Sequence, residues 1–303
     1  MTSIGFVGLG GMGSRMAARL LAGNQVYGTN RTRAKAADLI GAGLIWRDTP
    51  REVAAAATVI ISMVTDDAAL AAITTGPDGI LAGLAPGDVY LDMSTVSPEA
   101  SRALARQVGE RGAVLLDAPV SGSLSAASDG TLAIMASGDE AAFRSVEPLL
   151  RRLGSTVTYV GGSGRALLLK LAINLSLASQ MLAFGEGMLL ARRGGIEPEL
   201  AAEVIAASAV GSPMLRARVP LVLDPPEQPW FDLRLMHKDI GLVRRAAGDL
   251  GIVLPSALLA DEVLAAAEQL GYGQRDIAVL PEVLEQTDGH PPAVAPVAGP
   301  VTR

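Results

Sequence analysis

Two polar side chains interrupt a long apolar stretch near the middle of this 303-residue chain. Lys170 and Asn174 are four residues apart, which places both on one face of a helix. Burial can lower the pKa of a lysine toward neutrality, so that its side chain exchanges a proton with a reacting group. A lysine can also lay its apolar stem over a hydrophobic surface and keep its charge in water. Lys170 is therefore either a functional residue or a snorkelling one.

Two other segments place polar groups in unexpected settings. Residues 117–123, Asp-Ala-Pro-Val-Ser-Gly-Ser, directly follow an apolar run at 113–116 that we expect to be a strand. They lie beyond the carboxyl end of that strand, where open α/β sheets bind their ligands. The other segment, residues 231–239, combines Phe231 with the charged pair Lys238 and Asp239.

A glycine-rich loop at residues 8–13 predicts a dinucleotide site. Its sequence, Gly-Leu-Gly-Gly-Met-Gly, fits the pattern G-x-G-x-x-G and stands between an expected strand at 4–7 and an expected helix at 12–21. There the glycines allow a tight turn, a close approach of the pyrophosphate and close packing of helix on strand. The helix N-terminus offers free N–H groups and a dipole that favours an anion. A glycine-rich turn without a ligand is the alternative.

The end of the second expected strand, residues 25–29, indicates which dinucleotide binds. NAD enzymes usually carry an acidic residue there, about 20 residues after the loop, to hold the ribose 2′-hydroxyl. This chain has Asn30, Arg31 and Thr32 instead, followed by Arg33. A guanidinium can bind a 2′-phosphate through two hydrogen bonds. We therefore expect NADP (NADPH) as the cofactor, with NAD less favoured.

Short apolar runs alternate with helical patterns over the first half, which predicts an α/β domain with a parallel, doubly wound Rossmann sheet. We expect strands at 4–7, 25–29, 44–46, 58–62, 89–92, 113–116, 131–135 and 156–160, and helices at 12–21 and 31–40. The run Gly-Gly-Ser-Gly at 161–164 ends this pattern. We place the NADP-binding domain at residues 1–162.

The second half shows helical patterns alone. We expect helices at 165–193, 198–208, 232–250, 257–270 and 276–286. These predict an all-helical domain at residues 163–288, linked to the first domain by the long helix, whose many Leu and Ala residues suggest pairing between subunits. The Pro-rich segment 289–303 suits neither helix nor sheet, so we expect a mobile tail.

Composition and charge exclude several classes of protein. The chain has no cysteine, which excludes disulfides, thiol catalysis and cysteine-ligated metals. No group of histidines and carboxylates has metal-ligand spacing, so we expect no metal. A net charge of -6 does not suit a nucleic-acid partner. We find neither a signal peptide nor an apolar run of about 20 residues, so we expect a cytoplasmic protein without membrane contact.

Five motifs in order make the chain similar to the β-hydroxyacid dehydrogenase family, which includes 3-hydroxyisobutyrate dehydrogenases and glyoxylate/succinic semialdehyde reductases. The resemblance covers about residues 3–287. It rests on Gly8–Gly13, Asp92–Thr95, Asp117–Gly122, Lys170 with Asn174, and Lys238–Asp239. It implies a Rossmann domain, a helical domain like that of 6-phosphogluconate dehydrogenase, and a homodimer or homotetramer.

The resemblance also implies roles for single residues in hydride transfer between NADP and a small β-hydroxy acid or its semialdehyde. Lys170 would be the general acid/base, and Asn174 would orient the substrate. Ser121, with the backbone of Gly122 and Ser123, would hold the substrate's anionic group. Further substrate contacts would come from Thr95, Phe231 and Asp239. The cofactor would contact Gly8, Leu9, Gly10, Gly11, Met12, Gly13, Asn30, Arg31, Thr32, Met63, Val64, Thr95 and Lys238.

Two departures from the family pattern bear on the substrate. Ser123 and Ser125 stand where glycines are common in the family. The added hydroxyl groups and bulk leave open whether the anionic group is a carboxylate, a phosphonate or a sulfonate.

Two other functions remain open. One is an imine reductase of the same architecture, against which Lys170 argues because that position usually holds another residue there. The other is a non-catalytic NADP-binding regulator, against which Ser121, Lys170 and Asn174 argue together.

Overall fold

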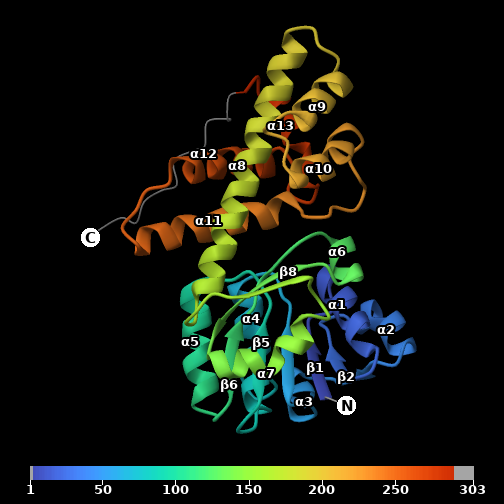
Figure 1. The fold of residues 1–303 in the computed structure, drawn as a ribbon, viewed down its shortest axis with the longest axis vertical. Helices are drawn as coiled ribbons and strands as arrows, with labels where there is room; N and C mark the ends of the chain where they lie inside the picture. Colours follow the sequence, from blue (N-terminus) through green and yellow to red (C-terminus); the bar gives the residue numbers. More distant parts are fainter. Residues whose placement is uncertain (1–2, 290–303) are drawn as a thin grey trace. The chain divides into compact units, whose positions relative to one another are not determined.

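The computed structural model describes residues 3–289 (Figure 1). Contacts divide the chain into two compact units, Met1–Leu171 and Ala172–Arg303, here called the sheet unit and the helical unit. The division falls inside the long helix α8 (Arg165–Arg193), whereas the sequence analysis placed it at residue 162. The expected tail at 289–303 lies outside the described residues, apart from Gly289.

The sheet unit is built on a nine-stranded sheet in the order β3-β2-β1-β4-β5-β6-β8-β7, with β9 paired to β8. The strands are β1 (Ser3–Val7), β2 (Gln25–Thr29), β3 (Ile45–Trp46), β4 (Val59–Ser62), β5 (Val89–Asp92), β6 (Val114–Asp117), β7 (Val120–Ser121), β8 (Ala133–Gly138) and β9 (Thr156–Tyr159). β1 to β6 run parallel, which confirms the predicted doubly wound sheet. β8 and β9 run in the opposite direction, because β8 is antiparallel to β6 and β7 and β9 is parallel to β8.

Helices cover both faces of this sheet. They are α1 (Gly11–Leu21), η1 (Arg33–Ala36), α2 (Ala37–Gly41), α3 (Pro50–Ala55), α4 (Asp67–Thr74), η2 (Ile80–Ala82), α5 (Pro98–Gly109), α6 (Leu124–Asp129) and α7 (Glu140–Leu150). Successive strand residues point to opposite faces, so Ile61 joins one apolar cluster and Ile60 the other. α1, α2 and α7 pack on the first face, and α3, α4 and α5 on the second. The helix expected at 31–40 is split into η1 and α2.

Arg19 ties α1 to two distant parts of the sheet unit. Its guanidinium donates to the carbonyl oxygens of Ser128 (2.8 Å) and Arg152 (2.9 Å). Gly130 leaves the space for it, because a Cβ at Gly130 would lie 2.3 Å from the Arg19 guanidinium. The α1 helix, which opens at the glycine loop, is therefore fixed at its far end as well.

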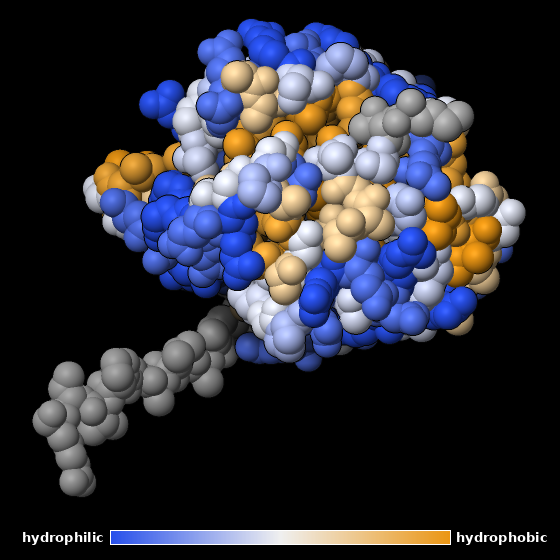
Figure 2. All heavy atoms as spheres, turned by 90° about the horizontal axis from the view of Figure 1, so that it is seen from below, coloured by the Kyte–Doolittle hydropathy of each residue, from blue (hydrophilic) through white to orange (hydrophobic). Residues whose placement is uncertain are grey.

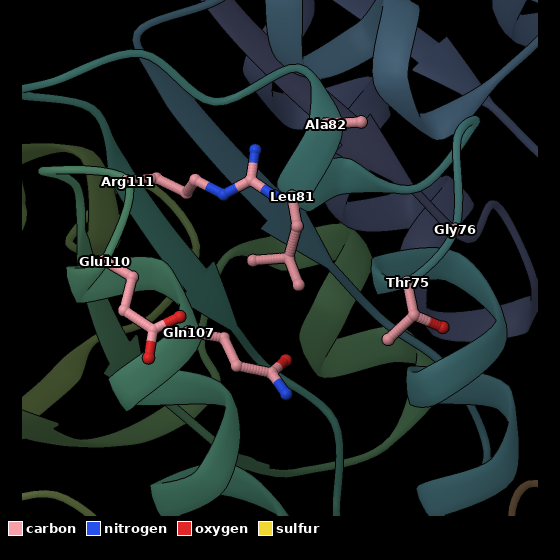
Figure 3. Close-up of a pocket in the computed structure, with 7 residues that line it drawn as sticks. All are labelled: Thr75, Gly76, Leu81, Ala82, Gln107, Glu110 and Arg111. Atoms are coloured by element: carbon pink, nitrogen blue, oxygen red, sulfur yellow. The ribbon is translucent and has the colours of Figure 1, made fainter.

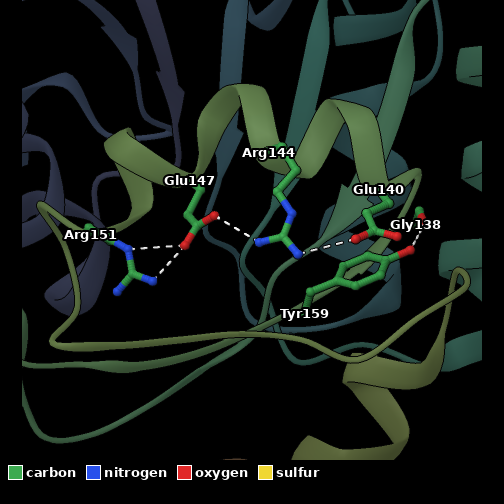
Figure 4. A network of polar contacts seen from close by, with 6 residues as sticks. All are labelled: Gly138, Glu140, Arg144, Glu147, Arg151 and Tyr159. Atoms are coloured by element: carbon green, nitrogen blue, oxygen red, sulfur yellow. Dashed lines mark hydrogen bonds and ion pairs between the residues drawn. The ribbon is translucent and has the colours of Figure 1, made fainter.

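Exposed ion pairs lie on the surface of the sheet unit. On α7, Arg144 bridges two glutamates and Arg151 pairs with Glu147, while the Tyr159 hydroxyl donates to the Gly138 carbonyl (Figure 4). Such exposed pairs contribute little stability. Seen from below, apolar residues form separate patches among charged ones (Figure 2).

A hollow of about 280 Å³ lies between the ends of α4 and α5, lined by Thr75, Leu81, Gln107 and Arg111 among others (Figure 3). None of the predicted site residues lines it. Both helices return there toward the amino ends of the strands, so the hollow lies away from the carboxyl edge of the sheet.

The helical unit holds most of α8 together with α9 (Pro198–Ala207), α10 (Pro213–Leu223), α11 (Leu233–Asp249), α12 (Pro255–Gln269), η3 (Ile277–Val279) and α13 (Leu280–Gln286). α10 was not expected. Pro213 occupies its first turn, where the missing N–H costs nothing, and Ser212 caps it by accepting from the Leu215 amide (3.0 Å). Pro220 lies inside the helix, so the segment looks like a loop in sequence.

By length and composition, α8 could cross a membrane, with a mean hydropathy of 1.6 over its apolar window. This corrects the expectation that no apolar run reaches that length. Within the helical unit, however, one face of α8 packs against the other helices, and 39% of that apolar window is buried. Met181, Leu182 and Phe184 are buried, and Gly185 lies close to Leu284 of α13.

Candidate functional site

Four loops of the sheet unit meet at the carboxyl edge of its parallel strands. They follow β1, β4, β5 and β6, and they carry residues 8–13, 63–64, 92–95 and 117–123. The strand order reverses between β1 and β4, because the chain builds outward from β1 to β3 and then crosses to β4. Ligands of open α/β sheets bind outside the carboxyl ends at such a switch point. The fold therefore brings these predicted loops together at one edge.

The glycine loop has the geometry of a pyrophosphate cradle. Gly8 has φ +96°, and a Cβ there would lie 2.4 Å from the Met63 carbonyl oxygen. A Cβ at Gly13 would lie 2.0 Å from the Gly8 carbonyl oxygen, so only glycine lets α1 start this close to β1. At Gly10 a Cβ would meet nothing within 4 Å in the described chain, and no side chain there caps α1. The first turn of α1 thus fits a dinucleotide pyrophosphate.

In the segment after β2, Asn30 supports the glycine loop, whereas Arg31 and Thr32 are exposed to solvent. The Asn30 side-chain oxygen accepts a hydrogen bond from the Leu9 amide (3.2 Å), and its nitrogen donates to the Thr32 carbonyl (3.2 Å). Asn30 therefore holds the glycine loop. Arg31 and Thr32 are exposed beyond the strand, while the Arg33 guanidinium lies 5.3 Å from the Trp46 ring centroid. Arg31 is accessible to a phosphate beside the loop.

A buried hydrogen-bond chain, which the sequence motif alone does not reveal, shapes the loop after β4. The Val64 amide donates to the Ser94 hydroxyl (2.9 Å), which donates in turn to Asp92 (2.6 Å). The Ser62 hydroxyl donates to the same carboxyl oxygen of Asp92 (2.8 Å). It also forms a hydrogen bond with the Tyr90 hydroxyl (2.8 Å). Val64, a predicted cofactor contact, is thus fixed by the Asp-x-Ser-Thr segment.

Asp92 cannot contact a ligand, because it is 1% exposed. Burial raises the pKa of its carboxyl group, the hydrogen bonds from Ser94 and Ser62 oppose the rise, and the nearby carboxyl of Asp117 adds to it. In the sequence, Asp92 stands out as a polar residue that ends a buried strand and as part of a family motif, but neither signal indicates a supporting role. Thr95, three residues on, is half-buried at the same edge.

The loop after β6 presents backbone and hydroxyl groups at the carboxyl edge. Ser121 ends β7, and Gly122 has φ +148° and is exposed. Ser123 caps α6 by accepting from the Ala126 amide (3.2 Å), and its hydroxyl lies 2.6 Å from that of Ser125. The serine that replaces a glycine therefore has a structural partner.

Lys170 and Asn174 lie on one face of α8, as the spacing predicted. Lys170 is 9% exposed and Asn174 is 2% exposed, so neither is a surface side chain. Burial is the condition under which a lysine becomes able to release and take up a proton near neutral pH. The structure thus disfavours the snorkelling interpretation, although the role itself remains a prediction.

Within the helical unit, three predicted site residues contact one another. The Asn174 amide nitrogen donates to one oxygen of Asp239 (2.5 Å), and Lys238 lies 2.8 Å from the other. Asp239 is buried on α11, so it orients the Asn174 side chain directly. His237 precedes Lys238 on the same helix. Its ring nitrogens lie instead near carboxyl oxygens of Glu268 (2.7 Å) and Asp261 (3.4 Å) on α12.

Phe231 is positioned by a buried ion pair that the sequence analysis missed. Asp276 accepts hydrogen bonds from the backbone amides of Trp230 (2.8 Å) and Phe231 (3.0 Å). Its other oxygen accepts from Arg218 of α10 (2.6 Å). Because α10 was not expected, nothing in the sequence linked Arg218 to this loop.

Comparisons with known proteins agree with this arrangement. Residues 3–161 match the model for the NAD binding domain of 6-phosphogluconate dehydrogenase. Residues 162–284 match the model for the NAD-binding region of NADP-dependent 3-hydroxyisobutyrate dehydrogenase.

Individual relatives span nearly the whole chain. Glyoxylate/succinic semialdehyde reductase 2 of Arabidopsis thaliana is 33% identical over 93% of this chain and 79% of its own. The 2-hydroxy-3-oxopropionate reductase of Escherichia coli K12 is 34% identical over 95% of this chain and 98% of its own. Among solved structures, Psf3 in complex with NADP+ and 2-OPP aligns with a TM-score of 0.86 at 29% identity, covering 93% of this chain and 99% of its own. The chain therefore belongs to the β-hydroxyacid dehydrogenase family of NAD(P)-dependent oxidoreductases.

Proposed function

We propose that this protein is an NADP-dependent oxidoreductase that interconverts a small β-hydroxy acid and its semialdehyde, with Lys170 as general acid and base. The observation that carries the proposal is the burial of Lys170 on α8. Two relatives named as semialdehyde and oxopropionate reductases support the substrate class.

The bound nicotinamide supplies the hydride in reduction and accepts it in oxidation. In reduction, the Lys170 ammonium donates a proton to the carbonyl oxygen as that oxygen becomes an alkoxide. In oxidation, the neutral amine takes the hydroxyl proton. Asn174, held by Asp239, donates to the substrate. The Ser121 hydroxyl and the backbone amides of Gly122 and Ser123 bind its anionic group.

NADP rather than NAD is proposed because of the segment after β2. Arg31 is exposed beside the glycine loop, and no acidic residue stands at residues 28–33 to hold a ribose 2′-hydroxyl. A guanidinium there can bind a 2′-phosphate in bidentate fashion. The NADP+ bound to Psf3 supports this choice.

A substrate panel tests the proposal. Glyoxylate, succinic semialdehyde, 3-hydroxy acids and cyclic imines are assayed with NADPH and with NADH or the oxidised forms, following absorbance of the reduced nicotinamide. We expect turnover of a semialdehyde or hydroxy acid, faster with the phosphorylated cofactor. Turnover of imines alone would indicate an imine reductase. NADPH binding without turnover on any substrate would indicate a regulator.

A further inference from the structure

The first turn of α8 is capped by side chains from the sheet. A helix leaves its first N–H groups without partners inside the helix, and a side chain at the N-cap usually accepts one of them. Here the first helical bond runs from the Leu168 amide to the Gly164 carbonyl, so Gly164 is the N-cap and has no side chain. Its φ of +86° also requires glycine at this turn.

Two buried residues replace the missing cap. Asp117 accepts from the Gly164 amide (2.9 Å), and Ser137 accepts from the Ala166 amide (3.0 Å). The Ser137 hydroxyl donates its own proton to the second oxygen of Asp117 (2.5 Å). The Leu167 amide is a further donor to Asp117. We call Asp117 and Ser137 the α8 clamp.

The α8 clamp is built on strands. Asp117 ends β6 and Ser137 lies on β8, and the two residues are register partners in the antiparallel pair. They are 1% and 0% exposed. The Ser137 hydroxyl and the Gly164 amide both donate to the Asp117 side chain, an arrangement that suits an ionised carboxylate. A negative charge is also favourable at a helix N-terminus. Burial raises the pKa of Asp117, and the hydrogen bonds from Ser137, Gly164 and Leu167 oppose that rise.

The clamp fixes the position of Lys170 on its helix. Ala166, which bonds Ser137, and Lys170 are four residues apart and lie on the same helix face. Holding the amides of Gly164, Ala166 and Leu167 sets both the rotation and the axial position of the turn that carries the lysine. A displacement of about 1 Å at a reacting group can cost about 100-fold in rate.

We propose that Asp117 and Ser137 are positioning residues for Lys170, which couple the carboxyl edge of the sheet to the helix that carries the acid/base. This inference rests on the proposed function, since it assumes that Lys170 transfers the proton. It divides the segment 117–123 into two parts. Its buried aspartate holds the helix, and its residues 121–123, of which Gly122 is exposed and Ser121 and Ser123 are half-buried, lie at the carboxyl edge of the sheet.

The first test follows the backbone. Hydrogen exchange of the amides of residues 164–168 is compared in the wild type, Asp117→Asn, Ser137→Ala and Asp88→Asn. Asp88 is a matched control, because it is a buried aspartate that accepts from a backbone amide, Ala85 (2.7 Å), but precedes β5. We expect faster exchange at 164–168 in the two clamp variants alone. Exchange equal to that of Asp88→Asn would overturn the clamp.

The second test is a double-mutant cycle with Lys170→Ala, using NADPH and succinic semialdehyde. We expect Asp117→Asn to lower kcat about tenfold or more, while the Kd for NADPH changes less than about twofold. In the Lys170→Ala background the same change should have little further effect on kcat. Equal losses in both backgrounds would overturn the positioning role.

The two tests also separate this inference from the proposed function. If Lys170→Ala alone retains more than about a tenth of kcat, the acid/base role is wrong whatever Asp117 does. The exchange of the first-turn amides then still shows whether the clamp holds the helix.

Discussion

At the scale of single residues, the motifs mark the loops of the site, and hydrogen bonds decide which member of each motif faces a ligand. Asn30 is predicted to contact the cofactor, and its side chain also accepts a hydrogen bond from the Leu9 amide. Asp92 and Asp117 stand in recognisable motifs and are both buried behind the edge they support. Sequence alone could not separate these roles, because burial and partner depend on neighbouring strands.

The buried carboxyl of Asp92 predicts a pH-dependent stability. Its folded-state pKa is raised above the unfolded value of about 4. The folded state therefore binds the proton more tightly, so the contribution of Asp92 to stability is present below the unfolded pKa and is lost as pH rises through the folded one. In Asp92→Asn this pH-dependent loss of stability is absent, because the asparagine amide does not titrate.

We expect the free energy of unfolding of Asp92→Asn, relative to wild type, to increase between pH 4.5 and pH 7.5, as measured by urea denaturation at both pH values. A difference that stays constant or decreases with pH would show that Asp92 does not titrate as its burial implies.

At the scale of elements, buried apolar runs made most strands predictable to within one or two residues, since few alternatives bury such runs. β8 ends three residues beyond its expected bound, and the two-residue strand β7 was not expected. α8 matched its predicted bounds. The misses have physical causes. α10 carries Pro213 and Pro220, and prolines resemble loop signals. The antiparallel direction of β8 is a matter of strand pairing, which apolar patterning does not encode.

The packing of α8 in the helical unit predicts a difference between two of its glycines. A Cβ at Gly185 would lie 2.8 Å from the buried Leu284 side chain, whereas one at Gly187 would lie 3.7 Å from Ile205. Gly187→Ala should raise the free energy of unfolding by about 0.5–1 kcal/mol through reduced backbone entropy. Gly185→Ala should be less stable than Gly187→Ala by about 1–3 kcal/mol, because Leu284 must move. Equal thermal midpoints for the two variants would contradict close packing at Gly185.

At the scale of the whole molecule, the residues assigned to cofactor and substrate are spread over two units. The sheet unit supplies the glycine loop, Arg31 and residues 121–123, and the helical unit supplies Phe231, Lys238 and Asp239. The family and fold could be predicted from five motifs in order. The supporting residues, such as Ser137 and Arg218, could not, because no motif contains them.

Cofactor binding should raise the stability of the molecule selectively. A ligand at about 100 times its Kd adds about 2.7 kcal/mol to the free energy of unfolding. We expect NADPH to raise the thermal midpoint more than NADH at equal concentration, and Arg31→Ala to remove the difference. Arg106→Ala, an exposed arginine on α5, serves as the control that keeps it. Equal shifts with both cofactors in the wild type would contradict the assignment of Arg31.

In the proposed function, the buried Lys170 transfers the proton. The most direct measurement of this role is kcat of Lys170→Ala with saturating NADPH and the best substrate of the panel, beside the Kd for NADPH. We predict that kcat falls by about 100-fold or more while NADPH binding is retained. A loss of less than about tenfold in kcat would contradict the acid/base role.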